Sequence, residues 1–326
     1  MRSGAVVVTG ATGFIGGAAA RAIVADGHHV TALHRRTVPP PDEPGLCWST
    51  YEDWIAETDR AEAVVHAAAV RHRHGVPGPE YLRENVALTD RLVRASQGRV
   101  GRFVLVSSIA VYGWPDLLPI DENSPVAPVG PYGESKAESE RIVRLSGLPF
   151  AIVRPSITYG PGDTNGLVDK LLRLVSNRRY LMVGNGENRL QLVYAEDLAN
   201  ALVLAALLPG LDGAEFICTY RDPISIAELS RIAADSVGRS LPRLHVPVPL
   251  AKLAAVGLET LWRAAPASLG PEPPVTREKI AMMTTDRSYR IDRMRDRLRW
   301  EPRTGYAEGL RKTAAAGRDV TASCRK

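Results

Sequence analysis

The residues best suited to chemistry in this sequence are a tyrosine and a lysine four positions apart, Tyr132 and Lys136. On a helix this spacing places both side chains on one face, one turn apart. A free phenol has a pKa of about 10, and a neighbouring ammonium group lowers that pKa by stabilising the phenolate. We therefore expect Tyr132 to pass a proton to or from a carbonyl or alcohol oxygen. The alternative is an ordinary exposed helix face.

Two serines, Ser107 and Ser108, end an apolar run that begins at Arg102 and predicts a buried strand. Open α/β sheets bind their ligands beyond the carboxyl ends of the strands. Ser108 is therefore expected to donate a hydrogen bond to the same substrate oxygen as Tyr132.

A glycine-rich stretch, TGATGFIG at residues 9–16, is the third part of the predicted site. The β-branched run at 5–8 before it predicts a strand, and the alanine-rich segment 17–25 after it predicts a helix. In this setting a glycine turn binds the pyrophosphate of a dinucleotide, whose nicotinamide would then carry out hydride transfer. The spacing is Gly-x-x-Gly-x-x-Gly, and the alternative is a plain turn whose small residues serve packing.

The segment after the second predicted strand, residues 30–33, indicates which dinucleotide binds. It reads His34-Arg35-Arg36 and contains no Asp or Glu. An acidic residue here holds the ribose hydroxyls of NAD, whereas an arginine accommodates the 2′-phosphate of NADP. Arg35, with Arg36 beside it, therefore predicts NADP. NAD remains the alternative if both arginines are only exposed loop charges.

The remaining predicted elements must position these residues. A strand at 63–69 ends in the small residues Ala67, Ala68 and Ala69, and another strand is predicted at 150–153. Helices are predicted at 80–96, 132–146, 167–175 and 197–208. Alternating strands and helices of this kind predict an α/β fold of Rossmann type, with a doubly wound parallel sheet.

We divide the chain into a dinucleotide-binding region and a smaller substrate-binding lid. The first comprises residues 1–160, and residues 190–218 return to it. The lid comprises 161–189 and 219–318, where short helices mix with proline-rich loops, and residues 319–326 form a tail.

The composition is that of an ordinary soluble enzyme, with 45% hydrophobic and 24% charged residues among 326. The net charge of +5 is small and spread along the chain, so no nucleic-acid partner is expected. No apolar run reaches the roughly 18 residues of a membrane span. The three cysteines, Cys47, Cys218 and Cys324, form no CxxC pair, which favours a reducing, cytoplasmic setting without zinc or disulfides. His72 and His74 have no carboxylate or cysteine beside them, so no metal site is predicted.

Taken together, the motifs resemble those of the extended short-chain dehydrogenase/reductases, the group often called NAD-dependent epimerase/dehydratases. The resemblance runs from Val6 to about Thr313. It rests on TGATGFIG at 9–16, HAAA at 66–69, Asn85, SSIAVYG at 107–113, YGESK at 132–136, RPSITYGPGD at 154–163, VYAEDLANAL at 193–202 and LRWEPRTGYAEGL at 298–310.

The resemblance implies a role for particular residues. Ser108, Tyr132 and Lys136 would form the catalytic set, Lys136 would also hold the nicotinamide ribose, and Asn85 would support the active site. The residues implied to line the cofactor are Gly10, Thr12, Gly13, Phe14, Ile15, Gly16, Arg35, Arg36, Ala67, Ala68, Ala69, Ser107, Tyr132, Lys136, Pro155, Ser156 and Ile157. The substrate contacts are expected from Ser108, Tyr159 and Arg189.

The resemblance does not fix the reaction. Nucleotide-sugar dehydratases of this family place an acidic pair directly after the catalytic hydroxyl residue, whereas Ile109 and Ala110 stand there in this chain, which disfavours 4,6-dehydration. Sugar-nucleotide epimerases usually carry an acidic residue after the second strand, where this chain has Arg35. The segment 184–186 and Arg189 do resemble the nucleotide-contacting segment of those epimerases.

The C-terminal part points to another branch of the family. Its proline-flanked stretches at 247–252 and 273–279 resemble 3β-hydroxysteroid dehydrogenases and related ketoreductases, and an apolar helix there would wall an apolar pocket. We predict an NADP-preferring oxidoreductase that interconverts a ketone and a secondary alcohol on a small-molecule substrate, in a chain that could form a homodimer. A nucleotide-sugar epimerase and a non-catalytic NADP-binding regulator remain as alternatives.

Overall fold

The computed structural model describes residues 5–35, 40–57, 59–71, 76–115, 117–164, 166–242, 245–264, 273 and 275–323. Arg36, His72, His74 and Cys324, for which the sequence analysis makes predictions, lie outside the described residues.

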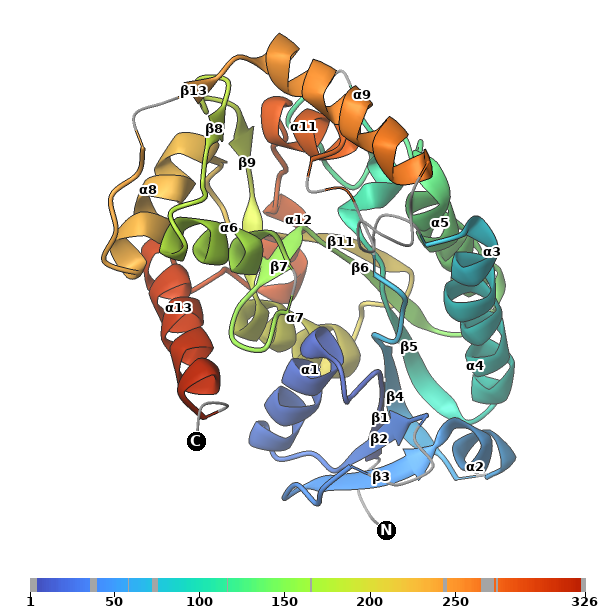
Figure 1. Ribbon diagram of the computed structural model, residues 1–326. Coiled ribbons are helices and arrows are strands. Elements are labelled where there is room, and N and C mark those ends of the chain that lie inside the picture. Colours follow the sequence, from blue (N-terminus) through green and yellow to red (C-terminus); the bar gives the residue numbers. More distant parts are fainter. Residues whose placement is uncertain are drawn as a thin grey trace.

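A seven-stranded parallel sheet forms the centre of the molecule, with the strand order β11-β6-β5-β4-β1-β2-β3 (Figure 1). Its strands are β1 (Ala5–Thr9), β2 (Val30–His34), β3 (Leu46–Thr50), β4 (Ala61–His66), β5 (Val100–Val106), β6 (Phe150–Pro155) and β11 (Ala214–Cys218). The order reverses between β1 and β4, and doubly wound sheets bind ligands at such a switch point. The predicted fold class is confirmed.

Helices cover both faces of this sheet because its strands are apolar on both sides. In β1, Val6 and Val8 are buried against one face, whereas Val7 is buried against the other. Helices α1 (Phe14–Ala25) and α7 (Ala195–Leu207) lie side by side on the first face, and α12 (Asp292–Leu298) completes it. Helices α2 (Tyr51–Ala56), α4 (Leu88–Ser96) and α5 (Gly130–Leu145) cover the second face.

The predicted helix at 80–96 is a continuous helical run with a wider turn inside it. It consists of α3 (Gly78–Tyr81), a π-helical turn, η1 (Leu82–Ala87), and α4. π-Helical turns are frequent at functional sites. Two strands end earlier than predicted: β4 ends at His66 and β5 at Val106, so the three alanines and both serines follow their strands.

The strands β3 and β11 are not predicted by the sequence pattern. The residues of β3 are half-buried or exposed at the edge of the sheet, so they form no apolar run. β11 is the opposite edge strand and contains Glu215 between its apolar residues.

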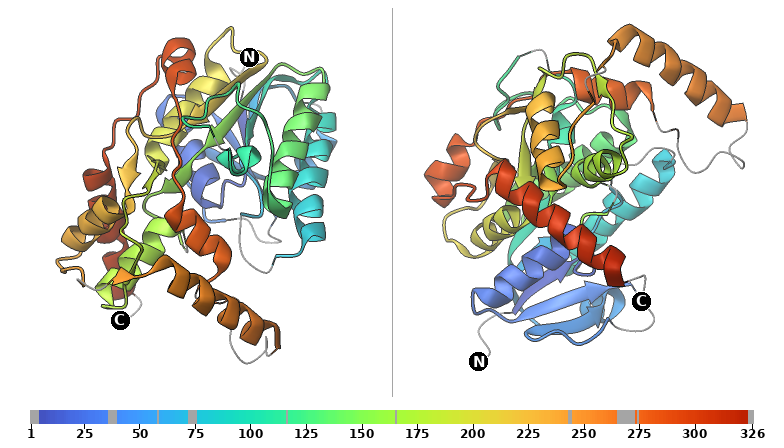
Figure 2. Two further views of the ribbon diagram at one scale, coloured as in Figure 1. Left: turned by 90° about the horizontal axis from the view of Figure 1, so that it is seen from above. Right: turned by 60° about the vertical axis from the view of Figure 1, so that its left-hand side comes forward.

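A second group of elements packs beyond the carboxyl ends of the strands (Figure 2). It contains β7 (Ile157–Tyr159), α6 (Leu167–Ser176), β8 (Met182–Val183), β9 (Arg189–Leu190), β10 (Leu192–Tyr194), β12 (Ile224–Ser225), α8 (Ile226–Ser236), β13 (His245–Val246), α9 (Val248–Ala264), α11 (Arg277–Thr284) and α13 (Tyr306–Ser323). It has its own buried cluster, in which α6, α8 and α13 meet. The predicted division of the chain at residues 160 and 219 stays a prediction.

Helix α9 lies at the outer edge of the molecule in both views of Figure 2. It packs on α11 through Ala251, Ala255 and Ile280, while Leu250 and Leu253 are exposed. Among the described residues, no helix combines the length and apolar character needed to cross a membrane.

Candidate active site

The glycine turn joins β1 to α1 and requires glycine at two positions for different reasons. Gly10 has a φ of +68°, and a Cβ there would lie 2.9 Å from the backbone of Ala68. A Cβ at Gly16 would lie 2.2 Å from the carbonyl oxygen of Gly10, so only glycine lets α1 begin this close to the turn. Gly13 is the N-cap of α1 and makes no side-chain cap. The open helix end and the close backbone approach fit the pyrophosphate of a dinucleotide.

The predicted hydroxyl pair is brought together. Ser108 follows β5 at the start of the short 3-10 helix η2 (Ile109–Tyr112), and its Oγ accepts a hydrogen bond of 3.1 Å from the N–H of Ala110. Tyr132 lies in the first turn of α5, and its side chain is hydrogen-bonded to Ser108. The two hydroxyls can therefore act on one substrate oxygen.

Burial raises the pKa of Tyr132, and the hydrogen bond from Ser108 and the charge of Arg71 only partly offset this shift. The phenol is therefore protonated at neutral pH. Lys136 is buried, its Nζ donates to the carbonyl oxygen of Val106 at 2.9 Å, and burial lowers its pKa to about 8. The expectation that Lys136 lowers the pKa of Tyr132 is not met in this structure, because Ser108 and Arg71 provide the opposing effects instead.

Asn85 positions the loop after β4 rather than facing the hydroxyl pair. It lies in the π-helical turn η1, where its Oδ1 accepts from the N–H of Val70 at 2.8 Å and its Nδ2 donates to the Val70 carbonyl at 3.3 Å. The same Nδ2 donates to Ser135 Oγ at 3.0 Å, and Ser135 in turn donates to the Tyr132 carbonyl at 2.8 Å. Asn85 thus connects the loop at the sheet edge to the turn of α5 that carries Tyr132.

A buried histidine, His66, links β1 and β4 to the π-helical turn. Its Nδ1 lies 2.8 Å from Thr9 Oγ1, and its Nε2 lies 3.0 Å from Thr89 Oγ1. Thr9 accepts from the N–H of Ala68, and Thr89 donates to the carbonyl oxygen of Asn85, so a neutral imidazole protonated on Nε2 satisfies the whole chain. Burial, with the charges of Lys136 and Arg35, lowers the pKa of His66 to about 3.

An ion-pair network beneath the serines fixes α5 against the sheet. Arg154 of β6 donates to both carboxylate oxygens of Glu140, at 2.8 and 2.7 Å, and both side chains are at most 1% exposed. Ser107 donates to Glu140 at 2.6 Å. Arg154 also donates to Tyr112 at 2.7 Å and to Glu215 at 2.6 Å. Sequence reasoning did not identify Glu140 or Arg154 as a pair, since they come from different elements.

Arg35 lies at the carboxyl end of β2, beside the glycine turn. Its guanidinium carbon is 5.9 Å from the centre of the Tyr51 ring, and the Tyr51 hydroxyl accepts from the N–H of Gly10 at 3.3 Å. Its Nη1 also donates to Glu84 of η1, a contact that the sequence did not suggest.

The other predicted cofactor residues lie around the same sheet edge. Ser156 follows β6. Its hydroxyl donates a hydrogen bond to Thr219 Oγ1 at 2.7 Å, and its N–H donates to the Cys218 carbonyl at 2.9 Å. Pro155 ends β6 and Ile157 begins β7. Thr12 lies in the glycine turn, Phe14 and Ile15 begin α1, and the three alanines after β4 face the glycine turn through Ala68.

The two predicted substrate contacts outside the hydroxyl pair, Tyr159 and Arg189, lie in the second group of elements, and their contact with substrate stays a prediction. Tyr159 is 1% exposed and packs in the second buried cluster, with its ring 5.6 Å from that of Tyr194. Its hydroxyl lies against Gly309, where a Cβ would come within 2.4 Å. Arg189 is exposed on β9, and its N–H donates to Asp286 at 2.7 Å. Tyr159 is therefore part of the buried cluster of this second group, whereas the Arg189 side chain is exposed.

One site residue that sequence reasoning missed is Arg71. It follows the alanines after β4, and its Nη1 donates to Asp163 at 2.7 Å while its Nη2 donates to the Thr164 carbonyl at 2.6 Å. Its charge lowers the pKa of Tyr132, which places the guanidinium near the phenol. Its partner Asp163 is the last residue of the motif RPSITYGPGD, and this motif was the one feature of the sequence that could have indicated the role of Arg71.

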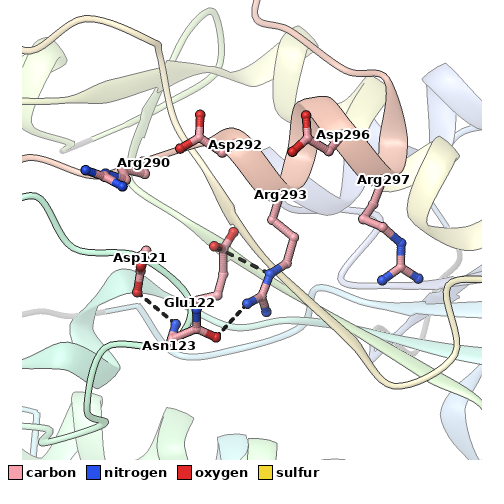
Figure 3. Close-up of a pocket in the computed structure, with 8 residues that line it drawn as sticks. All are labelled: Asp121, Glu122, Asn123, Arg290, Asp292, Arg293, Asp296 and Arg297. Carbon is pink, nitrogen blue, oxygen red and sulfur yellow. Dashed lines mark hydrogen bonds and ion pairs between the residues drawn. The ribbon is translucent and has the colours of Figure 1, made fainter.

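A separate surface hollow of about 370 Å³ lies between the loop at 121–123 and α12 (Figure 3). It is lined by Asp121, Glu122, Asn123, Arg290, Asp292, Arg293, Asp296 and Arg297. Arg293 donates to Asn123 at 2.7 Å and lies 3.8 Å from the Glu122 carboxylate, which accepts from the N–H of Ile217 at 2.9 Å. These contacts hold the loop after η2 against β11, and no predicted site residue lines the hollow.

Known proteins similar to this chain include both reductases and an epimerase. A 2-alkyl-3-oxoalkanoate reductase from Stenotrophomonas maltophilia (strain K279a) is 28% identical, with 95% of this chain and 98% of that protein covered. A UDP-glucose 4-epimerase from Vibrio cholerae is also 28% identical, with 95% and 94% covered. A 3-beta-hydroxysteroid dehydrogenase from Mycolicibacterium neoaurum is 28% identical over 79% of this chain and 77% of that protein.

The solved structure of MoeE5 in complex with UDP-glucuronic acid and NAD matches this fold with a TM-score of 0.76. The two chains are 25% identical, and the match covers 97% of this chain and 100% of that one. Residues 6–213, which include the glycine turn, Ser108, Tyr132 and Lys136, match the sequence model of the NAD dependent epimerase/dehydratase family. The chain is therefore an enzyme that belongs to the NAD dependent epimerase/dehydratase family, the extended short-chain dehydrogenase/reductases.

Proposed function

We propose that this enzyme is an NADP-preferring reductase that converts a ketone into a secondary alcohol. The observation that carries the proposal is the hydrogen-bonded pair of Ser108 and Tyr132, with Lys136 buried one helical turn away. Because burial keeps the Tyr132 phenol protonated at neutral pH, the side chain suits proton donation, which is the step that ketone reduction requires.

Each side chain then has one task at the substrate carbonyl oxygen. Tyr132 gives its proton to that oxygen as negative charge develops there, and Ser108 donates a hydrogen bond to the same atom. When bound, the nicotinamide supplies the hydride. Lys136, one helical turn after Tyr132, would hold the nicotinamide ribose, and Asn85 with Ser135 keeps the turn of α5 in place. Gly10, Gly13 and Gly16 would hold the pyrophosphate and Arg35 the 2′-phosphate.

We propose a small apolar ketone as the substrate class. Helix α9 and the neighbouring α11 provide apolar surface in the second group of elements, with Leu250 and Leu253 exposed. Two of the relatives named above are a 3-oxoalkanoate reductase and a hydroxysteroid dehydrogenase, whose names describe apolar substrates.

A nucleotide-sugar epimerase is the second candidate, because an epimerase is as similar to this chain as the reductases are. An epimerase would use the same hydrogen-bonded pair with no net consumption of dinucleotide. Arg35 after β2, where such epimerases usually carry an acidic residue, gives this candidate less support.

A single set of assays separates the two. Purified enzyme is given NADPH or NADH with 3-oxo esters of increasing chain length and a 3-ketosteroid, and dinucleotide absorbance is followed. In parallel, UDP-glucose is incubated without added dinucleotide, and UDP-galactose is measured. We expect NADPH consumption with at least one ketone and none with Tyr132→Phe. Formation of UDP-galactose without NADPH consumption by any ketone would overturn the proposal.

A further inference from the structure

An acidic residue lies beside Arg35 although none follows β2 in the sequence. Glu84 belongs to the π-helical turn η1, 49 residues further along the chain. One of its carboxylate oxygens accepts from Arg35 Nη1, and the other accepts from Arg83 Nε at 3.0 Å. The Glu84 side chain is 20% exposed and that of Arg35 is 53% exposed. The carboxylate is therefore held between two guanidinium groups at the protein surface.

This ion-pair cluster adjoins the glycine turn. Arg35 lies over the ring of Tyr51, whose hydroxyl accepts the N–H of Gly10. The carboxyl end of β2 is where a doubly wound fold meets the adenosine ribose of a dinucleotide. Arg35, the partner of Glu84, is therefore the side chain expected beside the 2′-hydroxyl or 2′-phosphate.

We propose that Glu84 is a specificity determinant that holds the preference for NADP over NAD to a modest level. The proposal rests on the dinucleotide-binding part of the proposed function. Glu84 occupies the guanidinium that a 2′-phosphate needs, and its negative charge repels that phosphate. A ribose hydroxyl carries no charge and can donate a hydrogen bond to a carboxylate, so NAD is not penalised.

The charge balance of the cluster favours the same change in selectivity. Arg35, Arg83 and Glu84 together carry one net positive charge, and replacing the carboxylate by an amide raises this to two. A doubly charged phosphate responds to the difference, whereas the hydroxyl of NAD does not. A 10-fold change in selectivity corresponds to about 1.4 kcal/mol, which lies between the interaction energies of two unit charges about 4 Å apart in bulk water and near a protein surface.

The test measures the dissociation constants of NADPH and NADH by titration calorimetry for the wild type and Glu84→Gln. We expect the NADPH-to-NADH affinity ratio to rise by about 10-fold in Glu84→Gln, and to rise less in 0.5 M salt because screening weakens exposed charge interactions. Glu84→Asp keeps the charge and should stay near the wild-type ratio. Glu52→Gln is the matched control, since Glu52 is a surface carboxylate whose ion-pair partner is Arg91, at 3.6 Å.

A double-mutant comparison shows whether the effect acts through Arg35. In an Arg35→Met background, Glu84→Gln should change the affinity ratio much less than in the wild type. The guanidinium for which Glu84 and the 2′-phosphate compete is then absent. An unchanged or lower NADPH-to-NADH ratio in Glu84→Gln would overturn the inference, since Glu84 would then only orient Arg35 for the phosphate. If the ratio shifts as expected but no ketone is reduced, the proposed reaction fails while this inference stands. If neither dinucleotide binds, both fail.

Discussion

The two ends of the predicted cofactor site are built differently. At the catalytic end, Glu140 and Arg154 are at most 1% exposed and joined by two hydrogen bonds, and Ser107 is tied to the same carboxylate. At the adenosine end, Arg35 is 53% exposed and its partner Glu84 is 20% exposed. The first network is shielded from water, and the second is open to it.

The difference follows from what each end has to do. Proton transfer needs the reacting groups held in a fixed geometry, which buried and mutually satisfied contacts provide. Discrimination between a hydroxyl and a phosphate depends on net charge more than on position, so exposed side chains suffice. Changes at the catalytic end should therefore affect folding and turnover, and changes at the adenosine end should affect only cofactor affinity.

The largest effect is expected when the buried network is broken at Arg154. In Arg154→Leu, Glu140 stays buried with Ser107 and Arg144 as its remaining partners. Removing one member of a buried pair lowers the free energy of unfolding by about 3–5 kcal/mol. Urea denaturation followed by circular dichroism measures this loss.

The control is an exposed arginine, Arg173, which pairs with Asp169 at 3.0 Å on the surface of α6. Arg173→Leu should lower the free energy of unfolding by about 1 kcal/mol or less. Equal losses in the two variants would remove the contrast between a shielded and an open network.

The next effect is catalytic. Tyr132→Phe removes the proton donor and keeps the ring, so kcat should fall by about 100-fold or more while NADPH affinity barely changes. Steady-state kinetics and NADPH titration measure the two quantities. Tyr81→Phe is the matched control, because the Tyr81 ring lies 5.9 Å from that of Tyr132 but is not in the catalytic set.

Lys136→Met extends the same test, since Lys136 lies one turn after Tyr132 on α5 and is predicted to hold the cofactor ribose in the same catalytic set. Residues that act as a unit have non-additive effects. The loss of kcat in the double variant should therefore be smaller than the product of the two single losses. Near-normal turnover of Tyr132→Phe at every pH would contradict the assignment.

The catalytic end also predicts how stability depends on pH. His66 stays neutral in the folded protein because its pKa is about 3, whereas an unfolded histidine has a pKa of about 6.5. As pH falls through 6.5, the unfolded chain takes up a proton that the folded chain does not, so stability is lost. Between pH 7 and pH 5 this loss is about 2 kcal/mol.

Urea denaturation at pH 7 and at pH 5 gives the free energy of unfolding at each pH, and the difference between the two values measures this effect. His66→Gln should lose about 2 kcal/mol less than the wild type on going from pH 7 to pH 5, because the titrating group is absent. His29→Gln, at an exposed position before β2, should lose as much as the wild type. If both variants behave alike, His66 does not carry the pH dependence.

The sequence was sufficient where the signal is local. The turn at 9–16 and the spacing of Tyr132 and Lys136 each lie within one short segment, so the residues themselves specify the strand, the turn and the helix face. The strand β3 was missed because edge residues need not be apolar. The roles of Glu84, Glu140 and Arg71 could not be read from the sequence, since each depends on a partner from another element.

The smallest effect is expected at the adenosine end, where Arg35→Met should weaken NADPH binding by about 10-fold and leave NADH binding nearly unchanged. The exposed guanidinium can form charge-assisted hydrogen bonds to a 2′-phosphate. Such bonds contribute about 1.5–3 kcal/mol, and screening by salt reduces this contribution at an exposed site. With either dinucleotide at saturation, kcat should match that of the wild type, because Arg35 follows β2 and contacts Glu84 and Tyr51 rather than the proposed catalytic set. Arg91→Met, an equally exposed arginine on α4, should change neither affinity. A lower kcat of Arg35→Met at saturating dinucleotide would show that the two ends of the cofactor site are coupled. If the wild type binds NADH tenfold more tightly than NADPH, Arg35 does not select NADP.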